Sequence, residues 1–329
     1  MIKIGFIDHF LDEWHANNYP KFIGDACGDE FKVAYAYAEK DKEGGLTTDE
    51  WCEKFGVERC STIKEVVDKS DVIIVLSPDN PERHLDLCRE PLASGKRVYV
   101  DKTFALSKEV AKEITAIAEA HNTPFYSTSA LRFANELKEL KREGICFINS
   151  RGPGNFDTYA IHQIEPIVCL MGAGAKRIMS VGSGKYESMV IEFENGRSAV
   201  MSHYGWNGGI DFEFTVSYED GTNVKVPQMS EYFPNFIKGL CEFFKTGKTF
   251  AAHDETISIM GIIEAGNKAL KKPGVWVEIC PKKKQKIKRS PFSNGLLFVH
   301  SIHSSHSIHS ILSIFCLRLF HTEVLRCFL

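Results

Sequence analysis

Residues 71–103, DVIIVLSPDNPERHLDLCREPLASGKRVYVDKT, have the pattern of a strand, a helix and a second strand. Residues 72–76 form a continuous apolar run, which is typical of a strand buried on both faces. A helical spacing of apolar residues follows, and residues 97–100 return as a strand. Ser77 ends the first of these strands, and Lys102 lies just beyond the second. Because ligands bind beyond the carboxyl ends of strands in an open parallel sheet, we expect both residues to border a binding site.

The remainder of the N-terminal part continues this alternation through about residue 130. Strands are predicted at residues 2–7 and 31–38, and helices at 47–55 and 107–121, where Ser107 is a suitable N-cap. Strands that alternate with helices predict an α/β fold with a doubly wound parallel sheet. We therefore expect a Rossmann domain over residues 1–130, followed by a helix over 132–143.

The pattern changes in the C-terminal part. Asn195-Gly196 and Asp220-Gly221 each separate two alternating runs, and these dipeptides favour two-residue hairpin turns. Two hairpins predict a second, α+β domain over residues 131–280, with a mostly antiparallel open sheet. Helices are expected at 231–246 and 255–271.

The bulk composition is that of an ordinary globular protein. The 329 residues are 43% hydrophobic and 25% charged, and the formal net charge of -3 gives no electrostatic reason to expect nucleic acid or an anionic membrane as partner. The ten cysteines have no paired metal spacing, and no apolar run reaches the roughly 18 to 20 residues of a membrane span. Met1 leads directly into a strand rather than a signal peptide, so we expect a cytoplasmic protein with reduced thiols.

The last segment, residues 281–329, contains the charge run PKKKQKIKR and the repeat SIHSSHSIHSILSIF. Histidines 300, 303, 306 and 309 are three residues apart, so metal binding is one interpretation. We favour a disordered or non-native extension, and for the charge run a solvated tail rather than a nucleic-acid patch. No metal site is predicted.

The motifs occur in an order that resembles the Gfo/Idh/MocA family of dehydrogenases, which are related to glucose–fructose oxidoreductase and inositol dehydrogenase. Its Glu-Lys-Pro motif resembles Asp101-Lys102-Thr103, and its His-x-x-Asp motif resembles the run from His162 to Glu165. Ser77, Pro78, His84, Gly95-Lys96 and Arg132-Phe133 also match in order and spacing. The resemblance covers roughly residues 1–280.

The resemblance implies an oxidoreductase that moves hydride to or from a sugar, polyol or related carbohydrate. Lys102 is then the candidate base or oxygen-polarising donor, since the pKa of lysine falls when it is desolvated. His162, with an intrinsic pKa near neutrality, is the candidate proton partner. The alternatives are a surface lysine and a buried histidine. The candidate substrate-binding residues are Arg132, Asp157, Tyr159 and Glu165.

The phosphate-binding turn departs from the family pattern. The three glycines of Gly-x-Gly-x-x-Gly correspond to Asp8, Phe10 and Glu13. These glycines normally allow the tight turn, the approach of the backbone to the pyrophosphate and close helix packing. Two acids at this point also oppose an anion, because like charges ~4 Å apart cost on the order of 4 kcal/mol at a surface-like dielectric.

A nicotinamide cofactor is still implied by the resemblance. Glu39, near the end of the second strand, can accept a ribose 2′-hydroxyl and would then favour NAD over NADP; the alternative is a solvated loop acid. The candidate cofactor-binding residues are Asp8, His9, Phe10, Glu39, Ser77, Pro78, His84 and Asp101.

Two functional hypotheses follow. The first is an NAD(P)-dependent carbohydrate oxidoreductase with a remodelled cofactor turn. The second is a family relative without dinucleotide binding, which acts as a small-ligand binding or regulatory protein or as a cofactor-free carbohydrate lyase. The resemblance also implies a homo-oligomer formed through the C-terminal sheet.

Overall fold

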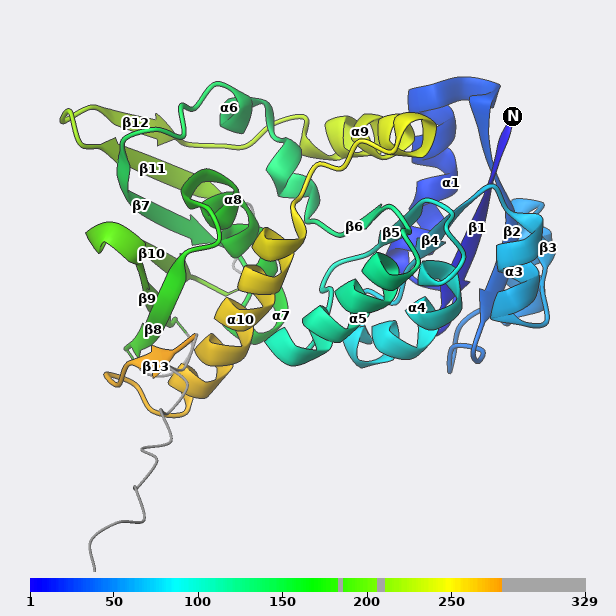
Figure 1. Cartoon of the computed structure of the whole chain (residues 1–329), viewed down its shortest axis with the longest axis horizontal. Helices are drawn as coiled ribbons and strands as arrows, with labels where there is room; N and C mark the ends of the chain where they lie inside the picture. Colours follow the sequence, from blue (N-terminus) through cyan, green and yellow to red (C-terminus); the bar gives the residue numbers. More distant parts are fainter. Residues whose placement is uncertain (183–185, 206–210, 280–329) are drawn as a thin grey trace, which may run out of the picture. The chain divides into compact units, whose positions relative to one another are not determined.

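The computed structural model describes residues 1–182, 186–205 and 211–279, which build two sheets (Figure 1). The first is a six-stranded sheet in the order β3-β2-β1-β4-β5-β6, and all of its pairings are parallel. This is the strand order of a Rossmann domain, so the predicted doubly wound sheet is confirmed. Its strands are β1 (Ile2–Asp8), β2 (Phe31–Ala38), β3 (Glu58–Arg59), β4 (Val72–Val75), β5 (Val98–Val100) and β6 (Phe125–Tyr126).

The connections of this sheet are helical, as the sequence predicts. Ser107 caps α5 through the N–H of Val110, and Thr47 forms a capping box with Glu50 at the start of α2. The helices are α1 (Trp14–Cys27), α2 (Thr48–Phe55), α3 (Ile63–Lys69), α4 (His84–Leu92) and α5 (Lys108–Ala120), with single 3₁₀ turns η1 (Gly28–Glu30) and η2 (Pro81–Arg83).

The predicted helix over residues 132–143 is wrong. The chain instead forms a 3₁₀ turn, η3 (Ala130–Phe133), and the four-residue helix α6 (Asn135–Lys138). Arg132 within this stretch is buried in an ion pair, so tertiary contacts replace the expected amphipathic helix.

The second sheet has seven strands in the order β12-β11-β7-β10-β9-β8-β13, and only the pairing of β7 with β10 is parallel. The predicted mostly antiparallel sheet and both predicted hairpins, β9–β10 and β11–β12, are confirmed. Its strands are β7 (Ile145–Gly152), β8 (Ala175–Val181), β9 (Ser188–Phe193), β10 (Ser198–His203), β11 (Glu213–Tyr218), β12 (Asn223–Val226) and β13 (Val277–Glu278). A 3₁₀ turn, η4 (Glu194–Gly196), joins β9 to β10.

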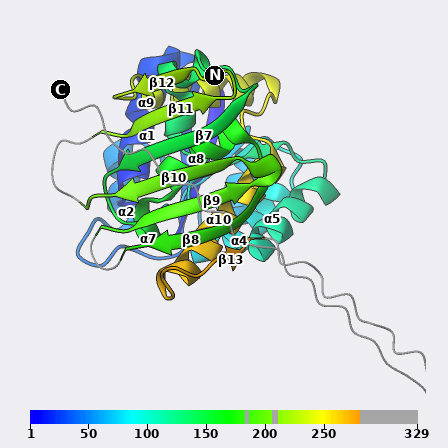
Figure 2. The ribbon, with the colours of Figure 1, turned by 90° about the vertical axis from the view of Figure 1, so that its left-hand side faces the viewer.

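Helices cover one face of this second sheet. In Figure 2 the strands lie side by side toward the viewer and the helices lie behind them, so no described helix covers the near face. Met189, Ile191 and Phe193 of β9 are fully buried on the covered side, whereas Val190 and Glu192 alternate toward the other. The remaining helices are α7 (Phe156–Tyr159), α8 (Ile161–Met171), α9 (Tyr232–Thr246) and α10 (His253–Leu270).

Helix α9 follows the second sheet in the chain but packs against the first. It contacts α1, and Phe236 lies with its ring centroid 5.4 Å from that of Tyr99 on β5. Phe243 meets Tyr126 of β6 edge-on at 4.9 Å. Such aromatic pairs add about 0.5–1.5 kcal/mol each beyond the area they bury.

Residues 281–329, for which the sequence predicts a disordered or non-native extension and which contain the four evenly spaced histidines, lie outside the described residues.

Candidate functional site

A pocket of about 430 Å³ lies beyond the carboxyl ends of β4 and β5, where the first sheet faces α7, α8 and the start of α9. Its size is within the range of small-molecule sites. Aromatic residues supply much of the wall, and several titratable groups line it. The lining residues are Glu13, Trp14, His15, Pro78, Asp79, Lys102, Ser129, Ala130, Leu131, Tyr159, His162, Phe212, Tyr232 and Phe233.

Lys102 and His162, the two predicted catalytic residues, both line this pocket although they come from different halves of the chain. Lys102 is held by its backbone N–H, which donates to Oδ1 of Asp101 at 2.8 Å. Nδ1 of His162 lies 2.8 Å from Oγ of Ser129. Burial, together with the charges of Lys102 and His15, lowers the pKa of His162 to about 3. His162 is therefore a neutral imidazole at neutral pH, and its pKa is far below the value expected from the sequence.

Tyr159, a predicted substrate-binding residue, forms an aromatic wall beside His162. The two rings meet edge-on with centroids 4.4 Å apart, and Tyr159 also stacks on Phe212 at 6.1 Å. Gly154 makes this placement possible, because a Cβ at that position would lie 2.6 Å from Cβ of Tyr159. The wall holds His162 between an aromatic face and Ser129.

Arg132 and Glu165, also predicted to bind substrate, bind each other. Nε of Arg132 lies 2.5 Å from the Glu165 carboxylate, and Nη1 lies 2.7 Å from Glu255. Thr128 donates a further hydrogen bond to Glu165 at 2.7 Å. Neither Arg132 nor Glu165 lines the pocket, and Asp157 is exposed away from the pocket lining. Their substrate-binding roles stay predictions, and the visible role of the first two is to join η3 to α8 and α10.

The turn that follows β1 is closed by Glu13. Its carboxylate accepts hydrogen bonds from the N–H groups of His15, at 2.7 Å, and Ala16, in the first turn of α1. Helix α1 therefore begins at Trp14, with Glu13 as its N-cap. These amides are the donors that a dinucleotide pyrophosphate uses in a Rossmann domain. The described arrangement does not fit a pyrophosphate at this position.

Three buried carboxyl groups gather around this turn. Asp8 and Asp101 are each 1% exposed and Glu13 is 3% exposed. Oδ2 of Asp8 has no hydrogen-bond partner, and Oδ2 of Asp101 lies 3.2 Å from Nδ1 of His15. Burial, followed by the neighbouring Glu13 carboxylate, raises the pKa of Asp8 well above its ordinary value. The surroundings of the turn are thus acidic, with His15 as the facing imidazole.

The predicted ribose-binding acid, Glu39, is engaged by other side chains. Arg83 binds it through two hydrogen bonds of 2.9 and 2.7 Å, and Nδ1 of His9 lies 2.7 Å from the same carboxylate. These contacts lower the pKa of Glu39, mainly through the Arg83 hydrogen bond. Phe10 lies beneath Lys42, whose Nζ is 5.5 Å from the ring centroid.

The remaining predicted cofactor residues differ in position. Pro78 lines the pocket, whereas Ser77 is buried with φ of 74° and donates from Oγ to the carbonyl of Asn80 at 3.0 Å. His84 is fully buried between the carbonyls of Leu76 and Phe104, and burial lowers its pKa. The His84 ring therefore links the chain just after β4 to the loop after β5.

The sequence interpretation missed several pocket residues. His15 follows the turn that lacks the expected glycines, and neither His15 nor Ser129 belongs to any of the motifs that the sequence offered. Tyr232 and Phe233 come from the start of α9, far along the chain. Only the weak signal of a histidine two residues after the turn could have indicated His15.

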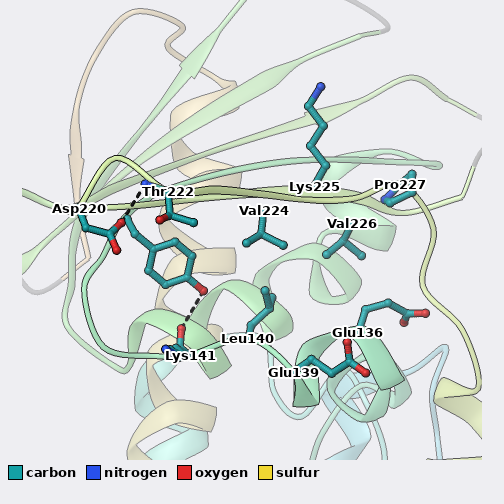
Figure 3. A pocket seen from close by; sticks show the side chains of 11 residues that line it. Glu136, Glu139, Leu140, Lys141, Asp220, Thr222, Val224, Lys225, Val226 and Pro227 are labelled. Carbon is teal, nitrogen blue, oxygen red and sulfur yellow. Dashed lines mark hydrogen bonds between the residues drawn. The ribbon is translucent and has the colours of Figure 1, made fainter.

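A second pocket, of about 410 Å³, lies between the loop after α6 and the β11–β12 hairpin (Figure 3). Its lining includes Glu136, Lys141 and Lys225. Glu136 already accepts from the N–H and hydroxyl of Ser230. This pocket contains none of the predicted site residues, so the first pocket is the candidate site.

Two kinds of feature are absent from the described residues, namely a cluster that could hold a metal ion and a helix that could span a membrane. Within residues 1–182, 186–205 and 211–279, no group of three or more His, Cys, Asp or Glu residues could hold a metal ion. In the same part of the chain, no helix is both long and apolar enough to cross a membrane.

Comparison with known proteins identifies relatives of this chain. Residues 27–128 match the model of the Gfo/Idh/MocA family, described as an oxidoreductase family with an NAD-binding Rossmann fold. An uncharacterized oxidoreductase from Streptococcus pneumoniae is 24% identical over 200 residues. That match spans 47% of this chain and 53% of the relative, so the chain matches about half the length of that protein.

Solved structures share the fold at low sequence identity. A probable dehydrogenase from Thermotoga maritima is 16% identical with a TM-score of 0.68, covering 84% of this chain and 99% of that one. Scyllo-inositol dehydrogenase from Lactobacillus casei, with bound NAD(H) and scyllo-inositol, is 15% identical with a TM-score of 0.66 over the same shares. These similarities establish the fold, and together with the family match they confirm the predicted resemblance.

Proposed function

We propose that this chain, whose Rossmann part is of the Gfo/Idh/MocA oxidoreductase type, is an NAD(P)-dependent dehydrogenase acting on a sugar, polyol or related carbohydrate. The observation that carries the proposal is the convergence of Lys102 and His162 on one pocket. A carbinol needs a proton partner and a group that stabilises charge on its oxygen, and these two side chains supply both.

The proton step uses the neutral His162. In the tautomer in which Nδ1–H donates to Ser129, the Nε2 atom is free to accept the carbinol proton. Lys102, as an ammonium, donates a hydrogen bond to the same oxygen and stabilises the charge that develops there. Imidazole with a pKa of about 3 is a weak base on its own, so the proton moves readily only as that oxygen becomes acidic during oxidation.

The pocket wall supports a small polyol. The hydroxyl groups of Tyr159 and Tyr232 are groups that both donate and accept hydrogen bonds, while Phe212 and Phe233 present apolar faces. A cyclic polyol has polar edges and apolar C–H faces, which these two kinds of side chain match. The relative from Lactobacillus casei that binds scyllo-inositol has the same fold.

The proposed hydride acceptor is NAD(P), with NAD preferred because Glu39 directly follows β2, where a ribose hydroxyl would share its carboxylate with Arg83 and His9. When bound, the nicotinamide supplies a two-electron acceptor. No step is derived through it, because Glu13 holds the amides where its pyrophosphate would lie.

That same observation favours a second candidate function. In this chain Glu13 occupies the amides that would bind the cofactor phosphates, while Lys102 and His162 remain in the pocket. These two side chains are sufficient for acid–base chemistry without a cofactor. Elimination from a carbohydrate breaks the C–H bond next to a carbonyl and the C–O bond one carbon further, and the hydroxyl leaves as water. His162 would take the α proton and return it to the departing hydroxyl, while Lys102 would stabilise the enolate.

The test is a polyol screen with the full chain and with two substitutions. NAD⁺ or NADP⁺ is offered with inositols, hexoses and amino sugars, and formation of the reduced cofactor is followed by absorbance. We expect activity that Lys102→Ala and His162→Ala each lower by at least about 10²-fold. The controls, Lys112→Ala and His121→Ala, change exposed residues of the same types.

The two candidates give different results. A carbohydrate converted without cofactor, detected by proton NMR of the mixture, supports the elimination. Absence of cofactor reduction across the whole screen contradicts the dehydrogenase.

A further inference from the structure

The first turn of α1 already holds an anion, and that anion is a side chain of the chain itself. Both Glu13 carboxylate oxygens are used, one by the N–H of His15 and the other by the N–H of Ala16. Glu13 is 97% buried, as its exposed fraction of 3% shows, and its backbone N–H is bound to the carbonyl of Leu11 at 2.7 Å. The side chain therefore lies inside the turn rather than on the surface.

A carboxylate and a phosphate group satisfy such a turn for the same reason. The free N–H groups at a helix N-terminus carry partial positive charge, which favours any anion within the first turn. α1 has 14 residues, so its terminus is a developed anion site. Once Glu13 occupies it, a second anion would meet both a filled set of donors and a like charge.

A second, independent observation concerns the groups around the turn. Oδ2 of Asp8 is buried without a hydrogen-bond partner, and the buried Oδ2 of Asp101 faces only Nδ1 of His15, 3.2 Å away. Burial and the Glu13 carboxylate raise the pKa of Asp8. Negative charge is thus already costly at this end of the sheet before any ligand arrives, and a pyrophosphate would add more.

We infer that Glu13 is an internal competitor for the dinucleotide pyrophosphate: the cofactor binds this chain only by displacing the Glu13 carboxylate from the α1 amides. The inference deepens the proposed function, on which it rests for its choice of ligand. Glu13 is then a residue that sets cofactor affinity, placed between the pyrophosphate position and the pocket that it also lines.

An ordinary helix cap is the rival explanation. A cap alone predicts that removing Glu13 weakens α1 and leaves ligand affinity unchanged, whereas a competitor predicts a gain in affinity. Replacing Glu13 with serine distinguishes the cap from the competitor, because serine is a preferred N-cap residue and carries no charge. Glu13→Ser therefore keeps a cap on α1 while it frees space and removes the negative charge.

The experiment measures NADH and inorganic pyrophosphate binding by calorimetry, with the full chain at one pH and salt concentration. The variants are Glu13→Ser, Glu13→Gln and the control Glu43→Ser, which removes an exposed acid from the loop after β2. We expect Glu13→Ser to lower the Kd for both probes by about tenfold or more, which corresponds to 1.4 kcal/mol. Glu13→Gln should give a smaller gain, because its amide still fills the turn, and Glu43→Ser should stay within about twofold of wild type.

Equal Kd values for wild type and Glu13→Ser, or no binding by either, would overturn the inference. An equal gain in Glu43→Ser would also overturn it, since the effect would then come from net charge. Circular dichroism of Glu13→Ser verifies that the variant is folded. The readout is binding rather than turnover, so a gain in affinity without polyol oxidation would uphold the role of Glu13 while contradicting the dehydrogenase.

Discussion

Oγ of Ser129 lies 2.8 Å from Nδ1 of His162, which joins the start of η3 to the first turn of α8. The same oxygen accepts the N–H of Leu131 at 3.3 Å, so its position is fixed by backbone. This contact sets the orientation of the imidazole through Nδ1, whereas the proposed proton step uses the other ring nitrogen, Nε2. Ser129 is thus a positioning residue for the proposed proton step.

Replacing this serine should slow turnover without unfolding the chain. Ser129→Ala removes one hydrogen bond to the ring, and such bonds contribute about 1 kcal/mol, or roughly fivefold in rate. We expect kcat to fall by that factor while KM changes little. Steady-state kinetics of Ser129→Ala and Ser129→Thr checks this, because threonine restores the hydroxyl. A loss that threonine does not rescue would contradict the positioning role.

His162 should remain neutral over the physiological range. Its pKa of about 3 lies below that of an unfolded histidine, about 6.5, so the unfolded chain binds the proton first as pH falls. The stability that His162 confers is therefore complete above about pH 6.5 and declines between about pH 6.5 and 3. Proton NMR should show a His162 ring signal that does not titrate between about pH 5 and 8, identified by its absence in His162→Gln. A midpoint near pH 6.5 would disprove this environment.

The ionisation of Asp8 should destabilise the folded chain as pH rises, which is the opposite pH dependence to that of His162. The pKa of Asp8 is raised in the folded chain, so the protonated form is favoured there, and ionisation above the unfolded pKa of about 3.9 opposes folding. We expect Asp8→Asn to raise the temperature of thermal unfolding at pH 7, and the difference from wild type to vanish near pH 4. The variant keeps the oxygen that accepts the N–H of His9. Equal unfolding temperatures at pH 7 would contradict the prediction.

The ion pair between Arg132 and Glu165 should matter for stability. Both side chains are nearly fully buried, and removing one partner leaves an uncompensated charge. Arg132→Ala should therefore lower the free energy of unfolding by about 3–5 kcal/mol. Chemical denaturation measures it, with Arg89→Ala, whose ion pairs are exposed, as a control expected to change by less than about 1 kcal/mol.

The uncovered face of the second sheet leads to a prediction about assembly. Val190 and Val200 lie directly opposite each other on β9 and β10, and both alternate with fully buried neighbours, so they lie on the face turned away from the core. No described helix covers that face of the sheet (Figure 2). We expect this face to pair with a second copy of the chain, and light scattering to give the mass of a dimer. Val190→Arg should then give a monomer, whereas Lys225→Glu on the edge strand β12 should not. A monomeric wild type would rule the pairing out.

Local patterns predicted most of the fold. The apolar run before Ser77 and the dipeptides Asn195-Gly196 and Asp220-Gly221 specify structure through residues adjacent in sequence, and the elements they predicted are present. The helix expected over residues 132–143 was wrong because Arg132 is buried by Glu165 and Glu255, which its own segment does not reveal.

The candidate site was only partly predictable, for the same reason. Lys102 and His162 belong to motifs with recognisable spacing, and both line the pocket. From the sequence, Glu13 is recognisable only as an acidic residue at a position where the family pattern has glycine. Its function as a cap depends on where α1 begins, and His15 in α1 faces Asp101, which follows β5 far along the chain.

The packing of α9 on the first sheet makes the two halves of the chain mutually dependent. Tyr99 and Tyr126 belong to the Rossmann strands, yet Phe236 and Phe243 from α9 complete their surroundings. The beginning of the same helix supplies Tyr232 and Phe233 to the pocket. An event that loosens α9 would uncover the first sheet and remove one wall of the pocket together, so cooperative folding and a competent pocket are here a single property of the chain.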